Sequence, residues 1–252
     1  MNMKTVLIHF FSALFFLNLS AQDIPTLIKE AEQLERAPNE RAALLKFKEV
    51  LKLQPANVLA LNKCSELCSR VGKRQANTKL RDDYYTAAKT YAGIALKISP
   101  TNSEANCVMA IALGRESLTK SGKEKINHAR EIKKYVDAAI KSDPNNYKAW
   151  HVLGRWHYEI STLNMFERAA VKILFGGLPG ASIKESIIAF EKSHSLASGF
   201  ILNYFEMSKA YKKDDQANKA IAAINTMLLL PNQTEDDNSI KQDGKKLLRE
   251  WQ

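Results

Sequence analysis

The feature that most constrains the fold is a proline followed two residues later by asparagine, which occurs at Pro55, Pro100 and Pro144. The spacings are 45 and 44 residues, and each proline separates two segments of helical periodicity. Proline cannot continue the helix before it, and the asparagine can cap the helix after it. Because one helix hairpin cannot bury its apolar face alone, a period of this size predicts a stack of hairpins.

The residues around each proline follow the tetratricopeptide pattern. After Pro144, Trp150, Leu153 and Gly154 match its Trp-x-x-Leu-Gly-x-x-Tyr signature, with His157 in the last position. The second helices repeat small or branched residues, namely Ala43, Phe47 and Val50, then Ala88, Ala92 and Ala95, then Ile132, Val136 and Ala139. Small side chains let two helices cross closely. We therefore predict an all-α protein, a tetratricopeptide-like right-handed superhelix of stacked helix hairpins (an α-solenoid), with Trp150 in its core.

Twelve helices are expected, and no sheet, because no stretch alternates with period two. They are predicted near residues 24–36, 39–53, 57–73, 78–98, 102–119, 122–142, 146–162, 164–175, 181–196, 200–212, 215–230 and 234–250. The repeat is longer than the usual period of about 34 residues. The extra residues fall between the two helices of a hairpin and are expected to lengthen them. The longest insert, residues 164–183, is predicted to be a short amphipathic helix closed by glycine at Gly176.

The N-terminal residues differ from the rest of the chain. Lys4 is the only charge before Ala21, and residues 6–19 form an apolar run of 14 residues. This pattern is typical of a secretory signal peptide, so we predict a signal over residues 1–21, cleaved near Ala21, and one repeat domain over residues 22–252. The chain would then be exported to the periplasm or the cell exterior. An uncleaved N-terminus that anchors the chain in a membrane is the alternative.

Charge and cysteine content limit the classes of partner. The net charge is +10, and loss of Lys4 with the signal would leave 36 basic against 27 acidic side chains, or +9. This balance favours acidic partners, whereas nucleic acid is not expected for an exported chain. The basic residues are spread over most helices, so solvation alone also explains them. Cys64, Cys68 and Cys107 are too few for a disulfide scaffold and are predicted as small core residues.

The second half of the chain resembles the regulator of microtubule dynamics protein family. The resemblance lies in LGRWHYE at 153–159, ER at 167–168 followed by LFG at 174–176, and Gly-Phe with Asn-Tyr at 199–204. It covers most of residues 22–252 and is strongest from about 140 to 230. It implies a tetratricopeptide-like domain without catalytic activity. Animal members are linked to microtubules, spindle poles and mitochondrial surfaces, and the domain of one member binds phospholipid at membrane contact sites.

Catalytic, metal and cofactor sites are not expected. The chain contains no HExxH, GxSxG or phosphate-loop motif. His151 and His157 are six residues apart, which does not place two ligands on one helical face as a spacing of four does. The glycine-rich residues 176–180 lack the lysine and hydroxyl of a phosphate loop and are expected to form a turn. We predict no enzyme.

A partner-binding groove is the better-supported kind of site. In this fold, defined positions of the first helix of each hairpin face the concave side. The predicted groove residues are Arg70, Arg115, His151, Arg155, Tyr158, Phe205, Lys209 and Lys213. Basic side chains next to aromatic ones suit an acidic peptide or a phosphate headgroup, although the same residues could simply be solvated.

The insert offers a second surface, an apolar ligand or membrane contact formed by Phe166, Ile173, Leu174 and Phe175. The simpler interpretation is that this helix fills a gap between hairpins.

The first functional hypothesis is a non-catalytic scaffold that binds a protein partner, or an acidic peptide, in the cell envelope. The alternative is a domain that binds or carries a lipid or other amphiphile, and a microtubule-associated role ranks third. Neither the partner nor the oligomeric state follows from the sequence.

Overall fold

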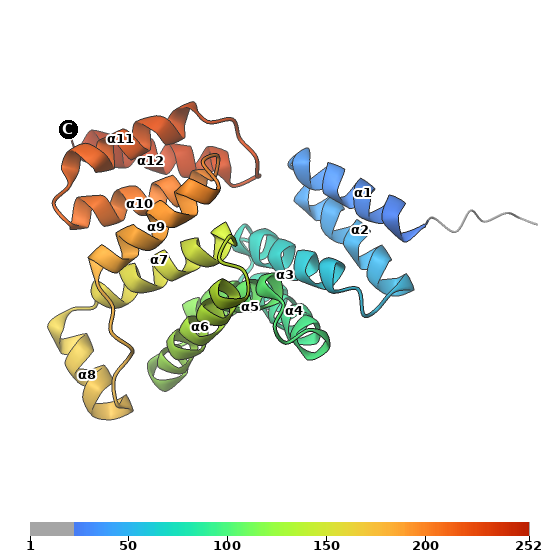
Figure 1. The fold of residues 1–252 in the computed structure, drawn as a ribbon, viewed down its shortest axis with the longest axis horizontal. Helices are drawn as coiled ribbons and strands as arrows, with labels where there is room; N and C mark the ends of the chain where they lie inside the picture. Colours follow the sequence, from blue (N-terminus) through green and yellow to red (C-terminus); the bar gives the residue numbers. More distant parts are fainter. Residues whose placement is uncertain (1–22, 252) are drawn as a thin grey trace, which may run out of the picture.

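The computed structural model describes residues 23–251, and the predicted signal peptide lies outside them. These residues form helices and no strands (Figure 1). Five hairpins pair α1 (Ile24–Arg36) with α2 (Glu40–Leu53), α3 (Val58–Lys73) with α4 (Thr78–Ile98), α5 (Ser103–Glu116) with α6 (Gly122–Ser142), α7 (Tyr147–Ser161) with α9 (Ile183–Leu196), and α10 (Ile201–Lys213) with α11 (Ala217–Leu229). A short 3-10 turn, Ser117–Thr119, follows α5, the insert forms α8 (Met165–Phe175), and α12 (Asp237–Trp251) ends the array. The predicted all-α solenoid is confirmed.

The repeated asparagines begin helices as predicted. The side chains of Asn57, Asn102 and Asn146 each accept a hydrogen bond from the backbone N–H three residues further on, at 2.8–3.0 Å. Such a bond satisfies one of the N–H groups that the first helical turn leaves unpaired. The repeat in the sequence is therefore a repeat of helix starts.

Small residues lie where helices cross. Ala88 and Ala139 are fully buried. A Cβ added to Gly154 of α7 would lie 2.7–2.9 Å from ring atoms of Phe190 on α9, closer than real Cβ contacts. The side chain of Ser186 donates a hydrogen bond to the Gly154 carbonyl oxygen at 2.7 Å at the same crossing. The predicted close crossing of helices at small residues is confirmed here.

Two local predictions are wrong. Trp150 is partly exposed, because it lies in the first turn of α7 and its indole N–H donates to the Pro144 carbonyl oxygen at 2.8 Å. Trp156 is the buried tryptophan instead, and its indole donates to the Ala129 carbonyl oxygen at 2.7 Å. The insert helix α8 fills no gap between hairpins, because none of its side chains that the structure describes is buried.

The cysteines are core residues, as predicted. Cys64, Cys68 and Cys107 are free thiols with no exposed surface. Burial raises the pKa of Cys64 to about 12 and that of Cys68 to about 11. Thiolates are the reactive form of cysteine, so these side chains are inert in the folded state.

The last loop of the chain reaches back to the first hairpins. The turn before α12 is shaped by Asp237, whose carboxylate accepts from the backbone N–H groups of Gln233 and Thr234 at 2.7 and 2.8 Å. The two acidic side chains of this turn, Glu235 and Asp236, bind Arg74 at the end of α3 at 3.1 and 3.2 Å.

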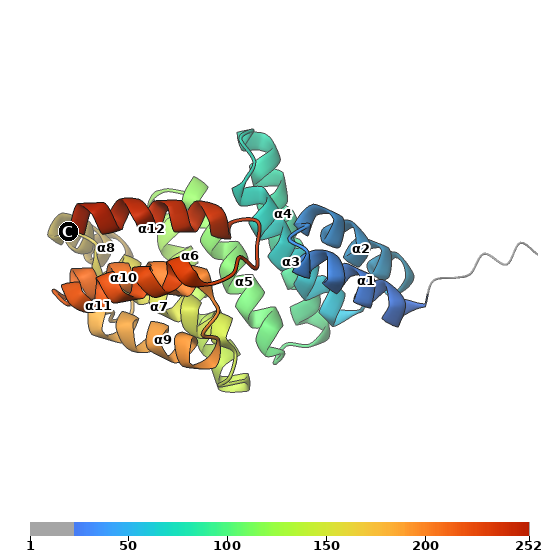
Figure 2. The same ribbon diagram turned by 90° about the horizontal axis from the view of Figure 1, so that it is seen from above.

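Two further contacts complete this junction. The carboxylate of Glu235 accepts from the backbone N–H of Glu40 at 2.7 Å, and Asp236 lies 3.5 Å from Lys73. We call Glu40, Lys73, Arg74, Glu235 and Asp236 the closing cluster. The loop between α11 and α12 extends towards α1 and α3 in both ribbon views (Figures 1 and 2). The array is therefore fastened between its first and last hairpins.

Candidate binding surface

The inner wall of the array is built from the first helices of successive hairpins. α3 packs against α5, α5 against α7, and α7 against α10. These four helices carry all the predicted groove residues. Among them are cations paired with carboxylates, the partly buried Arg115, which has no such partner among the described residues, and one buried histidine.

Arg70 on α3 is held by carboxylates. Its guanidinium lies 3.3 Å from Glu35 and 3.7 Å from Glu66, and it also contacts Glu40. Glu40 has no exposed surface and is bound by Arg74 at 2.6 Å as well. A buried carboxylate needs such partners, so the guanidinium of Arg70 stabilises the fold by compensating the charge of Glu40.

A second ion network crosses the wall from α3 to α7. The Lys148 ammonium lies 2.8 Å from the Glu66 carboxylate and also contacts Glu104. Burial opposes ionisation of Glu66, but Lys148 and Arg70 outweigh it and lower the pKa of Glu66 to about 2. Beside this network is a pocket of about 360 Å³ lined by Val58, Leu59, Asn62, Lys63, Asn102, Glu104 and Lys148. The Oδ1 atom of Asn62, at this pocket, is buried and accepts no hydrogen bond from the described residues.

The far end of the wall combines rings with charges. Lys209 on α10 lies over the rings of Tyr158 and Phe205, 5.3 and 5.4 Å from their centroids, and binds Glu206 at 2.8 Å. Arg155 on α7 lies 3.6 Å from the same carboxylate. Although burial opposes ionisation of Glu206, Arg155 and Lys209 lower its pKa. The structure thus joins four predicted residues around a carboxylate that the sequence did not single out.

Arg115 on α5 differs from the other cations of the wall. It forms no hydrogen bond or ion pair with any residue in the range 23–251, and its Nε atom is buried. Burial and the positive charge of Arg155 lower the pKa of the guanidinium, while Asp236 and Glu206 act in the opposite direction without touching it. A desolvated, unpaired cation is unfavourable, so Arg115 is a position where an external anion would gain affinity.

Two predicted groove residues do not belong to this surface. His151 is buried, with its Nδ1 atom 3.0 Å from the Oδ1 atom of Asn203, and its ring lies between Phe190 and Phe200. Burial lowers the pKa of His151 to about 4, so the imidazole is neutral at pH 7. This placement is a correction, and its cause is the aromatic packing around the crossing of α7 and α9. Lys213 is exposed at the end of α10 and has no ion-pair partner among the described residues.

The insert surface is exposed. Phe166, Ile173 and Leu174 are 81, 80 and 67% exposed, and Met165 beside them is 76% exposed. The side chain of Phe175 lies outside the part of the chain that the structure describes. These residues therefore form a surface separate from the inner wall.

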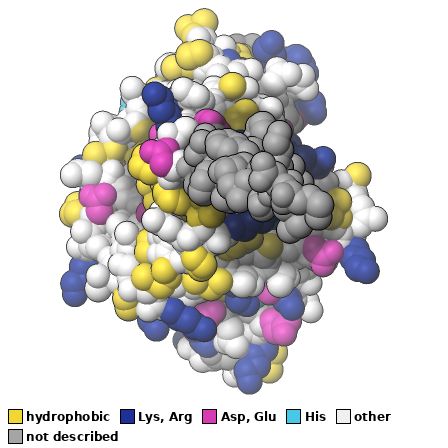
Figure 3. All heavy atoms as spheres, turned by 90° about the vertical axis from the view of Figure 1, so that its right-hand side faces the viewer, with side chains coloured by type: hydrophobic (Ala, Val, Ile, Leu, Met, Phe, Trp, Pro, Cys, Tyr) yellow, Lys and Arg dark blue, Asp and Glu magenta, His cyan; other side chains and the backbone are white. Residues whose placement is uncertain are grey.

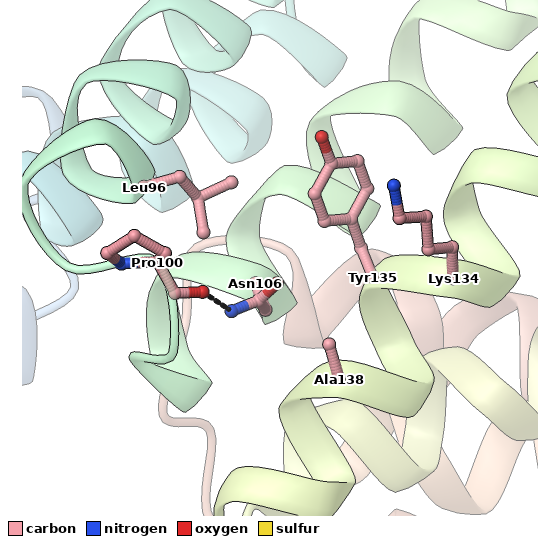
Figure 4. A pocket seen from close by; sticks show the side chains of 6 residues that line it. All are labelled: Leu96, Pro100, Asn106, Lys134, Tyr135 and Ala138. Carbon is pink, nitrogen blue, oxygen red and sulfur yellow. Dashed lines mark hydrogen bonds between the residues drawn. The ribbon is translucent and has the colours of Figure 1, made fainter.

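The outer side of the array offers a shallower hollow. A pocket of about 290 Å³ lies between the end of α4 and α6, lined by Leu96, Pro100, Asn106, Lys134, Tyr135 and Ala138 (Figure 4). The Asn106 amide donates to the Pro100 carbonyl oxygen at 3.0 Å and therefore already has a partner within the fold.

Seen from the first hairpin, basic side chains are dispersed among acidic and hydrophobic ones (Figure 3).

Residues 23–251 hold no cluster of three side chains suited to a metal ion. Among the helices of the same range, none combines the length and apolarity that crossing a bilayer requires.

Stacked hairpins with small residues at their crossings define a tetratricopeptide-like repeat protein. A thermophilic TPR protein of Thermus thermophilus has the same architecture, with a TM-score of 0.65 at 13% identity over 90% of this chain and 100% of its own. The type IV pilus biogenesis factor PilW is similar, with a TM-score of 0.53 at 15% identity over 90% of each chain. At these identities the likeness concerns the fold alone.

The chain belongs to the regulator of microtubule dynamics protein 1-3 family, whose model matches residues 27–252. It is 28% identical to human regulator of microtubule dynamics protein 2 over 68% of this chain, and it spans 42% of that relative's length. It is 25% identical to regulator of microtubule dynamics protein 1 of Caenorhabditis elegans over 74% of this chain and 80% of the relative. The resemblance found in residues 153–204 is thereby confirmed as family membership.

Proposed function

We propose that this chain is a non-catalytic helical repeat scaffold that binds an acidic segment of a protein partner on its inner wall, within the cell envelope. The location follows from the signal-like N-terminus and is part of the proposal. The partner class follows from the inner wall, because helical repeat arrays present such walls as extended binding surfaces.

The single observation that carries this proposal is the unpaired guanidinium of Arg115. Arg70, Lys148, Arg155 and Lys209 on the same wall each contact a carboxylate of the chain. Arg115 contacts none among the described residues, and the charge of Arg155 adds to its own. A carboxylate side chain of a partner would compensate this charge with a charge-assisted hydrogen bond.

The carboxylates of the wall support a non-catalytic role. Catalytic acids and bases need a pKa near the working pH. Glu66 and Glu206 instead have a lowered pKa because of cations that bind them directly. They act as fixed anions that hold Lys148, Arg155 and Lys209 in place.

The other hypotheses have less support. An amphiphile carrier would need an apolar interior, whereas the Glu66–Lys148 and Glu206–Lys209 pairs line the inner wall with charge that acyl chains would desolvate. The relatives' names associate them with microtubule dynamics. A microtubule role for this chain would require the signal-like segment not to direct export, so it ranks third.

Arg115→Gln tests the proposal against a fluorescein-labelled glutamate-rich peptide in a polarisation assay. A hydrogen bond to a charged group contributes about 1.5–3 kcal/mol, so the dissociation constant is expected to rise about tenfold or more. The affinity of the unmodified chain should fall with added salt, because charge pairs at a surface are screened.

Lys213→Gln is the matched control, because it removes one positive charge from an exposed site at the end of α10, outside the inner wall. It should change the affinity by less than about twofold, as expected for a single screened surface charge. A chain that binds a glutamine-rich peptide as tightly as the glutamate-rich one would refute the acidic-segment proposal. An equal loss of affinity in Arg115→Gln and Lys213→Gln would refute it as well.

A further inference from the structure

Helix α8 turns its apolar side towards solvent, the reverse of an ordinary surface helix. At about 100° per residue, one half of its circumference contains only apolar residues. These are Met165, Phe166, Ala169, Ala170, Ile173 and Leu174. Its four large side chains, which we call the apolar ridge, are 67–81% exposed. Val171 falls on the opposite half and is partly buried, unlike the other side chains of the helix that the structure describes.

This orientation is fixed at both ends of the helix. Asn164 and Glu167 form a reciprocal capping box, with hydrogen bonds of 2.8 and 2.9 Å. The Nε atom of Arg168 donates to the Leu163 carbonyl oxygen at 2.9 Å. At the other end, Gly176 has a left-handed conformation with φ 73°, and Arg130 of α6 donates to the Gly177 carbonyl oxygen at 2.6 Å. The ridge is therefore held outwards by polar contacts that involve none of its own side chains.

Exposed lysines lie on α8 and at the start of the helix that supports it. Lys172 is exposed at the edge of the apolar half. α8 rests on α6, whose first turns carry Lys123 and Lys125, within two helical turns of the Arg130 contact. Both lysines are exposed and have no ion-pair partner among the described residues. In Figure 1, α8 and α6 project towards the same lower edge of the molecule.

We propose that α8 is an interfacial docking helix that inserts the apolar ridge into an anionic lipid surface. Apolar side chains with lysines at their border are the arrangement that binds the boundary between headgroups and acyl chains. A second copy of this chain would face the same lysines with its own, so self-association on the ridge is opposed by charge. With 11 residues, α8 lies in the interface and does not cross it, because a span needs about 20.

The test uses the full chain with a fluorescent reporter on the ridge. Ile173→Cys gives one reactive thiol, because the three native cysteines are fully buried, and it can be labelled with nitrobenzoxadiazole. Vesicles of phosphatidylcholine with phosphatidylglycerol should raise and blue-shift the emission, and vesicles of phosphatidylcholine alone should do so much less. The control is a label at Leu229→Cys, which is 86% exposed on α11 and should keep its water-exposed emission. This control separates docking by α8 from attachment through the apolar N-terminus.

Two further variants in the Ile173→Cys background separate the contribution of the apolar ridge to vesicle binding from that of the lysines. Phe166→Glu should weaken vesicle binding about tenfold or more, since it removes one large apolar side chain from the ridge. Lys123→Glu with Lys125→Glu should remove most of the preference for phosphatidylglycerol. All these positions are exposed, so circular dichroism and the unfolding temperature should not change.

Three outcomes would overturn the inference. The label at residue 173 could keep a water-like emission with phosphatidylglycerol vesicles, or it could shift equally with and without Phe166. Emission that depends on protein concentration in the absence of lipid, together with a doubled mass in light scattering, would assign the ridge to a second copy of the chain.

Discussion

At the scale of single residues, burial decides what a side chain can do, and the sequence does not reveal burial reliably. His151 was predicted for the groove because its repeat position faces the concave side. In the structure it is buried between two phenylalanine rings. Arg115 and Arg155 lie on helices of the inner wall. Arg155 is paired with Glu206 of the next hairpin, a contact that the sequence alone does not indicate.

His151 makes the free energy of unfolding depend on pH. Its folded pKa of about 4 lies below the ordinary 6.5, so the unfolded chain binds the proton first as the pH falls. The contribution of the neutral ring is complete above pH 6.5 and is lost progressively towards pH 4, by about 3 kcal/mol in total. Urea unfolding across this pH range should show the decline, and His151→Gln should flatten it. An unchanged slope in the variant would contradict the assignment. His157, whose pKa burial also lowers, contributes to the remaining slope.

At the scale of helices, the sequence predicted most of the structure because local signals and packing agree. Twelve helices were expected, and the twelve α-helices observed in residues 23–251 begin and end within a few residues of the expected positions. Asparagine caps after proline mark the starts, and small residues at fixed places mark the crossings. The insert was harder to interpret, because its apolar face indicates a partner without indicating which one. An apolar face is usually buried against the same chain, and α8 is an exception.

Gly154→Ala tests the crossing of α7 and α9. The added methyl group would lie 2.7 Å from a ring carbon of Phe190, which is fully buried and cannot move aside. Overpacking of this kind costs about 1–3 kcal/mol, which chemical denaturation should measure. Gly180→Ala is the control, because a methyl group there meets no atom within 4 Å. Equal stability of the two variants would show that α7 and α9 do not cross as closely as described.

At the scale of the whole molecule, the closing cluster joins residues about 195 positions apart in the sequence. No repeat spacing predicts such a contact, because repeat patterns describe only how neighbouring hairpins pack. The cluster also reaches the inner wall, since Glu40 binds both Arg70 and Arg74.

Removing the two negative charges of the acidic turn should open the array. Glu235→Gln with Asp236→Asn removes the charges that hold Arg74 and Lys73. We expect a loss of about 1–3 kcal/mol of stability and a larger radius of gyration in small-angle X-ray scattering. Asp243→Asn is the control, because its pair with Lys246 is exposed and such pairs contribute little. An unchanged radius would mean that hairpin packing alone sets the curvature.

Fastening the first hairpins to the last turn has a consequence for how this protein can evolve. An open solenoid can gain or lose a unit by gene duplication or deletion, since every unit needs only its immediate neighbours. Here an extra unit would carry Glu235 and Asp236 away from Arg74, and a missing one would bring the ends into collision. The number of hairpins between Arg74 and the acidic turn is therefore fixed by a salt-bridged junction, and new specificity in this part has to arise within units, as the insertion of α8 between α7 and α9 illustrates.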